Sequence, residues 1–301
     1  MTLSRRSFCK LAGASGAAAL AAGPAVASAS TPAGVSTPSV LVDTTRCVGC
    51  RACEAACSES NGLPAPAGAG NAAAVAPART TDVNVFTVVN RHPAPASPGG
   101  ERFVKTQCMH CVSPACASAC VARALEKTTA GPVVYHPERC LGCRYCMVAC
   151  PFGVPKFEYD KAAPYVKKCE FCAERQAKGQ APACASVCPS GALQFGTRAD
   201  LIEVARQRVY QNPDKYVHHI YGETEAGGTS WLYISDVPFE RLGFRGDVGT
   251  TAYPEYTRTA LAAVPLILTI WPPLLMGIHT MAKRREEVRA AEAGGEDTAH
   301  A

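Results

Sequence analysis

The spacing of its cysteines constrains this chain more than any other feature of the sequence. Sixteen of the 17 cysteines fall into four rows of four. The rows are Cys47, Cys50, Cys53 and Cys57; Cys108, Cys111, Cys116 and Cys120; Cys140, Cys143, Cys146 and Cys150; and Cys169, Cys172, Cys184 and Cys188. Rows one and three share the spacing C-x2-C-x2-C-x3-C, whereas the second gap lengthens to four residues in row two and to eleven in row four. The final gap is always three, so the chain contains an internal repeat with insertions at one fixed place.

Three chemistries compete for these thiols. Disulfides suit exported proteins, but a chain of 301 residues that is 48% hydrophobic can bury a core and does not look like a small stapled scaffold. Zinc usually takes two separated pairs around one tetrahedral ion. Three cysteines two residues apart, with a fourth three residues on, have the spacing of bacterial [4Fe–4S] ferredoxins, in which the fourth cysteine ligates the other cluster of a pair. Sixteen cysteines therefore predict four [4Fe–4S] clusters in two pairs, and a zinc- or disulfide-stapled protein without redox function is the least favoured interpretation.

Short apolar segments rich in β-branched and aromatic residues surround the rows. They predict strands at residues 39–43, 84–90, 132–136 and 192–196. Residues 61–80 and 91–101 are rich in Ala, Pro and Gly, lack periodicity and are expected to be loops. Residues 197–211 are amphipathic and predict a helix packed on the domain. We therefore expect an α+β fold of duplicated bacterial ferredoxin-like (dicluster) domains with long loops.

The N-terminus has the three blocks of a twin-arginine export signal. Arg5 and Arg6 precede a short, Ala-rich apolar run, and small residues follow. We expect residues 1–27 to be this signal, although cleavage after Ala29 fits as well as cleavage after Ala27. Cys9, the one cysteine outside the rows, would leave with it. A basic N-terminus on a surface helix is the less favoured interpretation.

A second apolar segment lies near the C-terminus. Residues 259–282 contain no formally charged side chain, and as a helix they would span about 36 Å, enough to cross roughly 30 Å of hydrocarbon. Membrane helices tolerate the three prolines of this segment better than helices in water do. The basic residues 283–285 follow at once, which predicts a cytoplasmic tail over residues 283–301 if the body is exported. A buried helix of the soluble domain is the alternative.

Charge and motifs exclude several other functions. The formal charge is +5, and the expected signal carries three of these charges, so the chain has no basic footprint for nucleic acid. The Gly-rich residues 225–230 lack the strand–G-x-G-x-x-G–helix context of a nucleotide site. No row is left over for a catalytic metal, so we expect a chain that carries electrons without a catalytic site of its own.

Several polar residues lie close to the rows. His110 lies inside row two, where four cysteines are already available, so we expect it to be a hydrogen-bonding neighbour and not a ligand. The basic residues beside the rows are Arg46, Arg51, Lys105, Arg139, Arg144, Lys167 and Lys168. Two interpretations stay open for them: positive charge that raises the potential of an anionic cluster, or solvated surface charge.

With the four rows in place, the chain resembles the four-cluster iron–sulfur subunits of exported, membrane-bound oxidoreductases, the dimethyl-sulfoxide-reductase and formate-dehydrogenase group. The likeness rests on the segments CVGCRACEAAC, KTQCMHCVSPAC, CLGCRYCMVACPFGVPKFEYD, KKCEFC and CASVCPSGALQFGTR. A further segment, HIYGETEAGGTSWLYISDVPFERLG at residues 219–243, followed by the apolar helix, is most similar to the iron–sulfur subunit of periplasmic nickel–iron hydrogenases of the HybA type.

The resemblance implies which cysteines share a cluster. Row one pairs with row four, and row two with row three. The implied ligand sets are Cys47, Cys50, Cys53 and Cys188; Cys57, Cys169, Cys172 and Cys184; Cys108, Cys111, Cys116 and Cys150; and Cys120, Cys140, Cys143 and Cys146. Such proteins form a wire between a catalytic subunit and a quinone-reactive integral membrane subunit.

These observations give the expected organisation of the chain. A four-cluster domain would occupy residues 40–200 with a loop-rich insertion at 61–101, an extension at 201–258 would pack on a partner or membrane subunit, and a transmembrane helix would follow at 259–282. The expected function is electron transfer between a periplasmic catalytic subunit, with a nickel–iron hydrogenase favoured, and the membrane quinone pool. The same wire in a molybdenum enzyme, either a formate dehydrogenase or a reductase of sulfur or nitrogen compounds, is the alternative.

Overall fold

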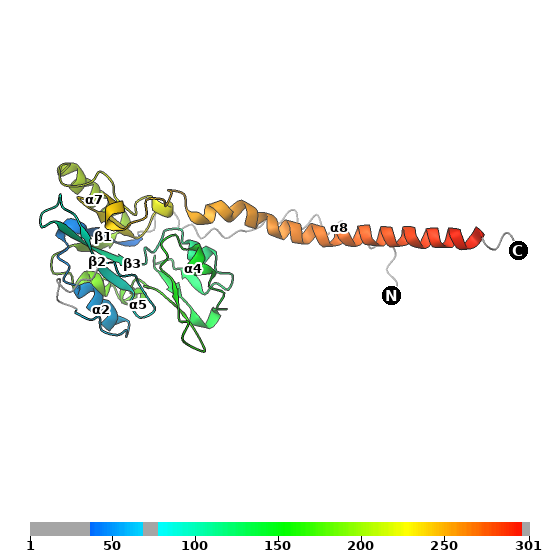
Figure 1. The fold of residues 1–301 in the computed structure, drawn as a ribbon, viewed down its shortest axis with the longest axis horizontal. Helices are drawn as coiled ribbons and strands as arrows, with labels where there is room; N and C mark the ends of the chain where they lie inside the picture. Colours follow the sequence, from blue (N-terminus) through cyan, green and yellow to red (C-terminus); the bar gives the residue numbers. More distant parts are fainter. Residues whose placement is uncertain (1–36, 69–77, 297–301) are drawn as a thin grey trace. The chain divides into compact units, whose positions relative to one another are not determined.

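A computed structural model describes residues 37–68 and 78–296, with side chains described as far as residue 290 (Figure 1). The predicted export signal, including Arg5, Arg6 and Cys9, and residues 297–301 lie outside the described residues. The chain divides into two units, one compact and extending through Glu255, the other containing the C-terminal helix from Tyr256 onward.

The compact unit is built on a three-stranded sheet. Strand β1 (Pro38–Asp43) lies in the middle, antiparallel to β8 (Leu193–Thr197) and parallel to β9 (Trp231–Ile234). Val40, Leu41 and Val42 of β1 are almost completely buried, as expected for a central strand with both faces covered. The strands predicted at residues 39–43 and 192–196 are confirmed within one residue, whereas β9 was not predicted.

A long hairpin joins β2 (Thr87–Pro93) to β3 (Glu101–Gln107), which lie side by side in Figure 1. Their register pairs Thr87 with Gln107 and Pro93 with Glu101. The strand predicted at residues 84–90 therefore exists but begins and ends three residues later. The prediction of a loop over residues 91–101 was wrong at both ends, because residues 91–93 and 101 complete the antiparallel ladder; Pro93 is tolerated because it is the last residue of its strand.

Two smaller hairpins belong to the part of the unit that carries rows two and three. The first pairs β4 (Leu125–Lys127) with β5 (Val133–Tyr135), and the second pairs β6 (Lys156–Phe157) with β7 (Val166–Lys167). The strand predicted at residues 132–136 is confirmed as β5. Leu125, Val133 and Val166 form an apolar cluster here together with the buried Cys116 and Cys146.

Short helices follow or contain the cysteines of every row. They are α2 (Ala52–Ser60), α3 (Ala115–Ser118), α4 (Tyr145–Ala149), α5 (Ala173–Ala177) and α6 (Ala183–Ser186). Four 3₁₀ turns complete the set: η1 (Thr44–Arg46), η3 (Pro137–Arg139), η4 (Glu225–Gly227) and η5 (Phe239–Leu242). Helix α2 packs against α6, and α3 packs against α4.

The segment expected as a separate extension is part of the compact unit. Helix α7 (Arg198–Gln211) starts at the Thr197 cap, whose side chain accepts a hydrogen bond from the Asp200 amide. This agrees with the helix predicted at residues 197–211. Its buried face, with Leu201 and Ala205, packs on Leu41 of β1 and Leu232 of β9. Because β9 also pairs with β1, residues 201–255 complete the first sheet and its core.

The C-terminal unit contains the long helix α8 (Tyr253–Glu296), coloured from orange to red in Figure 1. Pro265, Pro272 and Pro273 lie inside the helix and do not end it. Residues 253–290 are long and apolar enough to cross a membrane, and no other helix in the described part of the chain is. The side chains of its apolar window are exposed within the described part of the chain.

A buried carboxylate fixes the helix that carries Cys53 and Cys57. Glu54 is 1% exposed and accepts hydrogen bonds from the Arg51 and Arg79 guanidinium groups and, at 2.6 Å, from the Val89 amide of β2. Burial alone would raise the pKa of Glu54, but the hydrogen bonds from Arg79 and Arg51 outweigh it and hold the pKa below its ordinary value.

Glu54→Gln should therefore destabilise the protein strongly. It leaves Arg51 buried without its anion, which costs about 3–5 kcal/mol and should lower the midpoint of anaerobic thermal unfolding by roughly 10 °C. Because the pKa of Glu54 is lowered in the folded state, its contribution is complete above the ordinary value of 4.5 and is lost as the pH falls through the lower folded value. The exposed Glu59→Gln on the same helix is the control, and equal midpoints for the two variants would contradict the assignment.

Candidate iron–sulfur sites

Each row turns through a left-handed backbone position next to its second cysteine. Arg51 and Arg144, which follow Cys50 and Cys143, have φ angles of 61° and 60° and begin α2 and α4. In row two His110 has φ 45°, and in row four Phe171 and Cys172 have φ 58° and 49°. Such angles cost about 1–2 kcal/mol per non-glycine residue and concentrate at functional sites. The turn reverses the chain so that the third cysteine enters a short helix beside the first two.

The strand registers bring the rows together in pairs. Val42 of β1 pairs with Leu193 of β8, and Leu125 of β4 pairs with Tyr135 of β5. Row one begins five residues after Val42, and row four ends five residues before Leu193. In the same way, row three begins five residues after Tyr135, and row two ends five residues before Leu125. Row one therefore meets row four, and row two meets row three, at equivalent places in two equivalent strand pairs.

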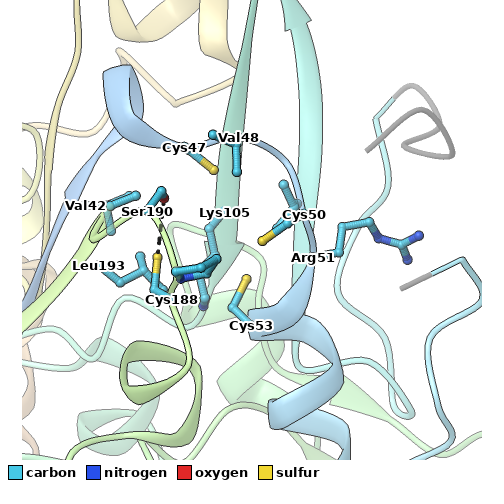
Figure 2. Close-up of a pocket in the computed structure, with 13 residues that line it drawn as sticks. Val42, Cys47, Val48, Cys50, Arg51, Cys53, Lys105, Cys188, Ser190 and Leu193 are labelled. Atoms are coloured by element: carbon cyan, nitrogen blue, oxygen red, sulfur yellow. Dashed lines mark hydrogen bonds between the residues drawn. The ribbon is translucent and has the colours of Figure 1, made fainter. Parts of the chain in front are cut away.

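A first group of four cysteines lines one cavity. Figure 2 shows the sulfur atoms of this group pointing into a common space. The group consists of Cys47, Cys50, Cys53 and Cys188. The cavity measures about 380 Å³, part of it open to solvent, and Lys105 also lines it. Burial, followed by the Cys188 and Cys50 thiols, raises the pKa of Cys47 to about 11.

A second group lies deeper in the same half of the unit. It consists of Cys57, Cys169, Cys172 and Cys184. Burial, aided by Cys184 and Cys172 and opposed by the charge of Lys105, raises the pKa of Cys57 to about 12. Burial likewise raises the pKa of Cys169 well above its ordinary value, with Cys57 as the next cause. The four thiols are thus electrostatic neighbours.

The other eight cysteines form a third and a fourth group. The third consists of Cys108, Cys111, Cys116 and Cys150, and the fourth of Cys120, Cys140, Cys143 and Cys146. Burial raises the pKa of Cys111 well above its ordinary value, and the other three thiols of its group raise it further. Burial raises the pKa of Cys146 to about 11, and again the other three thiols of its group add to the effect.

Electrostatic influences between the groups place them in a series. Besides burial, Cys184 of the second group raises the pKa of Cys53 of the first. The pKa of Cys169 in the second group is raised, after burial and Cys57, by Cys108 of the third. Cys146 of the fourth group contributes to the raised pKa of Cys116 in the third, which burial raises most. The groups therefore follow one another in the order first, second, third, fourth.

The donor chemistry fits iron–sulfur clusters better than single ions or disulfides. All sixteen cysteines of the rows are free thiols. A tetrahedral zinc with bonds of about 2.3 Å needs sulfur atoms roughly 3.8 Å apart, yet no group of three or more His, Cys, Asp or Glu side chains in the part of the chain described is placed to hold one metal ion. A [4Fe–4S] cluster takes four thiolates that stand farther apart, one at each iron. Burial raises the pKa of the Cys47, Cys57 and Cys146 thiols, so these three are protonated at neutral pH and must release their protons when they bind iron.

A buried histidine supplies a second test of this fit. His110 is 1% exposed, and its Nδ1 accepts a hydrogen bond of 3.0 Å from the Val133 amide, which leaves the proton on Nε2. Nε2 is buried and finds no partner among the described residues. Burial lowers the pKa of His110 well below its ordinary value, so the ring is neutral. A sulfur acceptor nearby would satisfy this N–H, in agreement with the expectation that His110 is a hydrogen-bonding neighbour.

The basic residues beside the rows separate into two kinds. Arg46 and Arg139 are about half exposed; Arg46 lies near the buried Asp43, and Arg139 forms a surface ion pair with Glu126. Lys105 and Lys168 are 2% and 3% exposed, and neither forms an ion pair with a described carboxylate. Burial alone would lower the pKa of Lys105, but Cys184 and Cys53 outweigh it and raise the pKa.

Sequence reasoning missed the residues that shape these sites from other elements. Phe103 of β3 covers Gly49 in row one, and Trp231 of β9 lies under the Lys105 ammonium group at 4.4 Å from the ring centre. Gln107 holds the same ammonium group at 2.8 Å. In the sequence, only the glycine repeated between the first two cysteines of rows one and three indicates that another side chain packs closely there. The other contacts depend on strand pairing and leave no signal in the sequence.

Gly49→Ala and Gly142→Ala form a matched pair of tests. Both glycines have left-handed φ angles, 69° and 68°, so both variants lose about 1–2 kcal/mol to backbone strain. A Cβ at residue 49 would lie 2.5 Å from the Phe103 ring, whereas at residue 142 the nearest atom, from Phe157, is 3.9 Å away. We expect Gly49→Ala to lose bound iron and sulfide and Gly142→Ala to keep most of it. Equal losses in anaerobic iron and sulfide assays would contradict the role of Phe103.

Comparisons with known proteins agree with these sites. A family model described as a 4Fe-4S dicluster domain matches residues 101–198. A protein of Nitratidesulfovibrio vulgaris is 47% identical over 296 residues, which cover 96% of this chain and 80% of that protein. The hydrogenase-2 operon protein HybA of Escherichia coli O157:H7 is 35% identical over 86% of this chain and 87% of its own length.

A shorter match extends to the iron–sulfur subunit of a formate dehydrogenase. The nitrate-inducible formate dehydrogenase iron-sulfur subunit of Escherichia coli K12 is 35% identical over 198 residues, 64% of this chain and 66% of that subunit. HybA matches over most of both chains, and the dicluster domain model covers rows two to four. This chain therefore belongs to the family of iron–sulfur electron-transfer subunits that includes HybA and the formate dehydrogenase iron–sulfur subunits.

Proposed function

We propose that this chain relays electrons through four [4Fe–4S] clusters between a periplasmic catalytic subunit and the quinone pool of the membrane. The observation that carries this proposal is the continuous series of four groups of four cysteines. Each cluster, when bound, supplies a one-electron carrier. The chain's own residues bind the clusters, exclude water from them and set their spacing, while a partner converts the substrate.

The proposed ligand sets follow the four groups. They are Cys47, Cys50, Cys53 and Cys188; Cys57, Cys169, Cys172 and Cys184; Cys108, Cys111, Cys116 and Cys150; and Cys120, Cys140, Cys143 and Cys146. Rows one and four would form one ferredoxin-like half and rows two and three the other. The packing of α2 on α6 and of α3 on α4, together with the equivalent strand registers, supports this duplication.

A nickel–iron hydrogenase is the favoured catalytic partner. The similarity to HybA covers 86% of this chain, whereas the similarity to the formate dehydrogenase subunit covers 64%. Much of the difference must lie outside the four rows, which occupy residues 47–188. The same electron relay in a molybdenum enzyme, either a formate dehydrogenase or a reductase of sulfur or nitrogen compounds, is the second candidate, supported by the formate dehydrogenase match.

The proposed location is the periplasmic face of the cytoplasmic membrane. The twin arginine at residues 5–6 supports export, and the apolar span within α8 supports an anchor in the membrane. The basic residues 283–285 favour a cytoplasmic end for that helix. An integral membrane subunit that reacts with quinone would then accept or supply electrons beside the anchor.

Anaerobic purification of the intact complex tests this function. Four clusters require about sixteen iron and sixteen acid-labile sulfide atoms per chain. About eight of each would contradict the four-cluster model. A co-purifying large subunit that contains nickel supports the hydrogenase, whereas one that contains molybdopterin supports the alternative.

Cys150→Ser tests the exchange of ligands between rows. Cys150 lies in row three but belongs to the third group, since it raises the pKa of Cys111 after burial and Cys108. The variant should damage the cluster on Cys108, Cys111 and Cys116 first and leave the cluster of its own row less affected. Electron paramagnetic resonance of the reduced complex distinguishes the two. Selective loss of the cluster on Cys140, Cys143 and Cys146 would show that the row keeps its own fourth ligand.

A further inference from the structure

Lys105 is a buried cation without a described anionic side chain as its partner. It lies on β3 and is 2% exposed. Its Nζ donates a hydrogen bond of 2.8 Å to the Gln107 side-chain oxygen and lies 4.4 Å from the centre of the Trp231 ring. No described carboxylate lies within ion-pair distance of Lys105. The buried carboxylate of Glu54, on the neighbouring helix α2, forms its ion pairs with Arg51 and Arg79 instead.

The surrounding residues hold this ammonium group in place. The Gln107 side-chain amide donates to the Tyr233 hydroxyl at 2.8 Å, and that hydroxyl donates to the Lys105 carbonyl at 2.9 Å. Both Gln107 and Tyr233 are buried. The charge is therefore fixed by a closed set of contacts between β3 and β9 and cannot swing out to water. An isolated ammonium group in such a place is costly unless negative charge lies nearby.

Among the residues that the structure describes, the candidates for that negative charge are the cysteine groups on either side. Lys105 lines the cavity of the first group together with Cys53 and Cys188 (Figure 2). It also lowers the pKa of Cys57 and Cys184 of the second group against the larger effect of burial. A single fixed charge thus lines the cavity of the first group and acts electrostatically on two thiols of the second.

We propose that Lys105 is the shared internal counter-ion of the two clusters bound by rows one and four and that it raises the reduction potential of both. The proposal rests on the proposed function, since it requires clusters at these groups. Each reduction adds one negative charge to a cluster, and a nearby fixed cation stabilises the reduced state more than the oxidised state. Because water is excluded around Lys105, this effect is screened less than that of a surface lysine.

The third group of cysteines has other cations nearby, so the proposed effect of Lys105 is specific to the first and second groups. Lys127 donates to the Cys111 carbonyl at 3.0 Å, and Lys168 donates to the carbonyls of Val133 and Cys169. Lys127 acts on Cys111, and Lys168 acts on Cys116, both members of the third group. Neither lysine forms an ion pair within the described residues. Removing Lys105 should therefore shift the potentials of one pair of clusters and leave those of the other pair in place.

Lys105→Met in the intact complex tests this directly. Redox titration followed by electron paramagnetic resonance should show two of the four clusters becoming harder to reduce. At a fixed potential we expect at least a tenfold lower ratio of reduced to oxidised cluster for these two, about 59 mV for one electron. Lys105→Arg, which keeps the charge, should move them less. Lys127→Met should shift a different cluster, and the exposed Lys178→Met should shift none.

Gln107→Glu provides an independent variant that keeps the shape of the site. It places a carboxylate against the Lys105 ammonium group, neutralises it and should shift the same two clusters in the same direction. This variant therefore tests whether the Lys105 charge sets the two reduction potentials even if Lys105→Met loses iron and its potentials cannot be measured. Unchanged potentials in Gln107→Glu with full iron content, or an equal shift of all four clusters, would overturn the proposal. A wild-type complex without four clusters would instead overturn the proposed function.

Discussion

The compact unit depends on bringing sixteen thiols together, all but Cys143 buried or partly buried. Burial is the largest cause of the raised pKa of Cys47, Cys57 and Cys146, so these groups are uncharged thiols until a metal takes the place of the proton. The first two groups combine rows one and four, which are far apart in the sequence, so the long-range pairing of β1 with β8 must form before their members can meet. On the proposed ligation, cluster binding and folding of this unit therefore stabilise each other.

The strand pairs provide the geometry for this. Strand β1 leads into row one and β8 follows row four, and because the two strands are antiparallel, the exit of one lies beside the entrance of the other. Strands β4 and β5 repeat the arrangement for rows two and three with the same distances in sequence. The insertions that lengthen rows two and four lie between the second and third cysteines, away from these strand ends. The repeat can thus vary in length without changing the pairing of rows.

Local sequence patterns predicted the elements that bracket the rows, since β1, β5, β8 and α7 each show a clear apolar period or a short β-rich run. They did not predict β9, because its four residues are all buried and show no alternation of apolar and polar side chains. They also did not predict that β9 pairs with β1, which lies almost two hundred residues earlier in the sequence. The error at residues 91–93 has a similar cause, because Arg91, His92 and Pro93 have loop-like composition but are paired with β3. The sixteen candidate ligands could be found from spacing alone, whereas their grouping depended on resemblance until the strand registers were known.

The charges inside the unit follow a consistent rule. Where a carboxylate is buried beside a row, as at Glu54, two arginines match it, but the buried ammonium groups of Lys105 and Lys168 are matched by no described carboxylate. Positive charge thus exceeds negative charge around the cysteine groups. Such an excess destabilises a unit without clusters and favours one with anionic clusters. On the proposed role of Lys105, its buried charge favours both cluster binding and cluster reduction, so one distribution of charge sets the stability of the unit and its electron affinity.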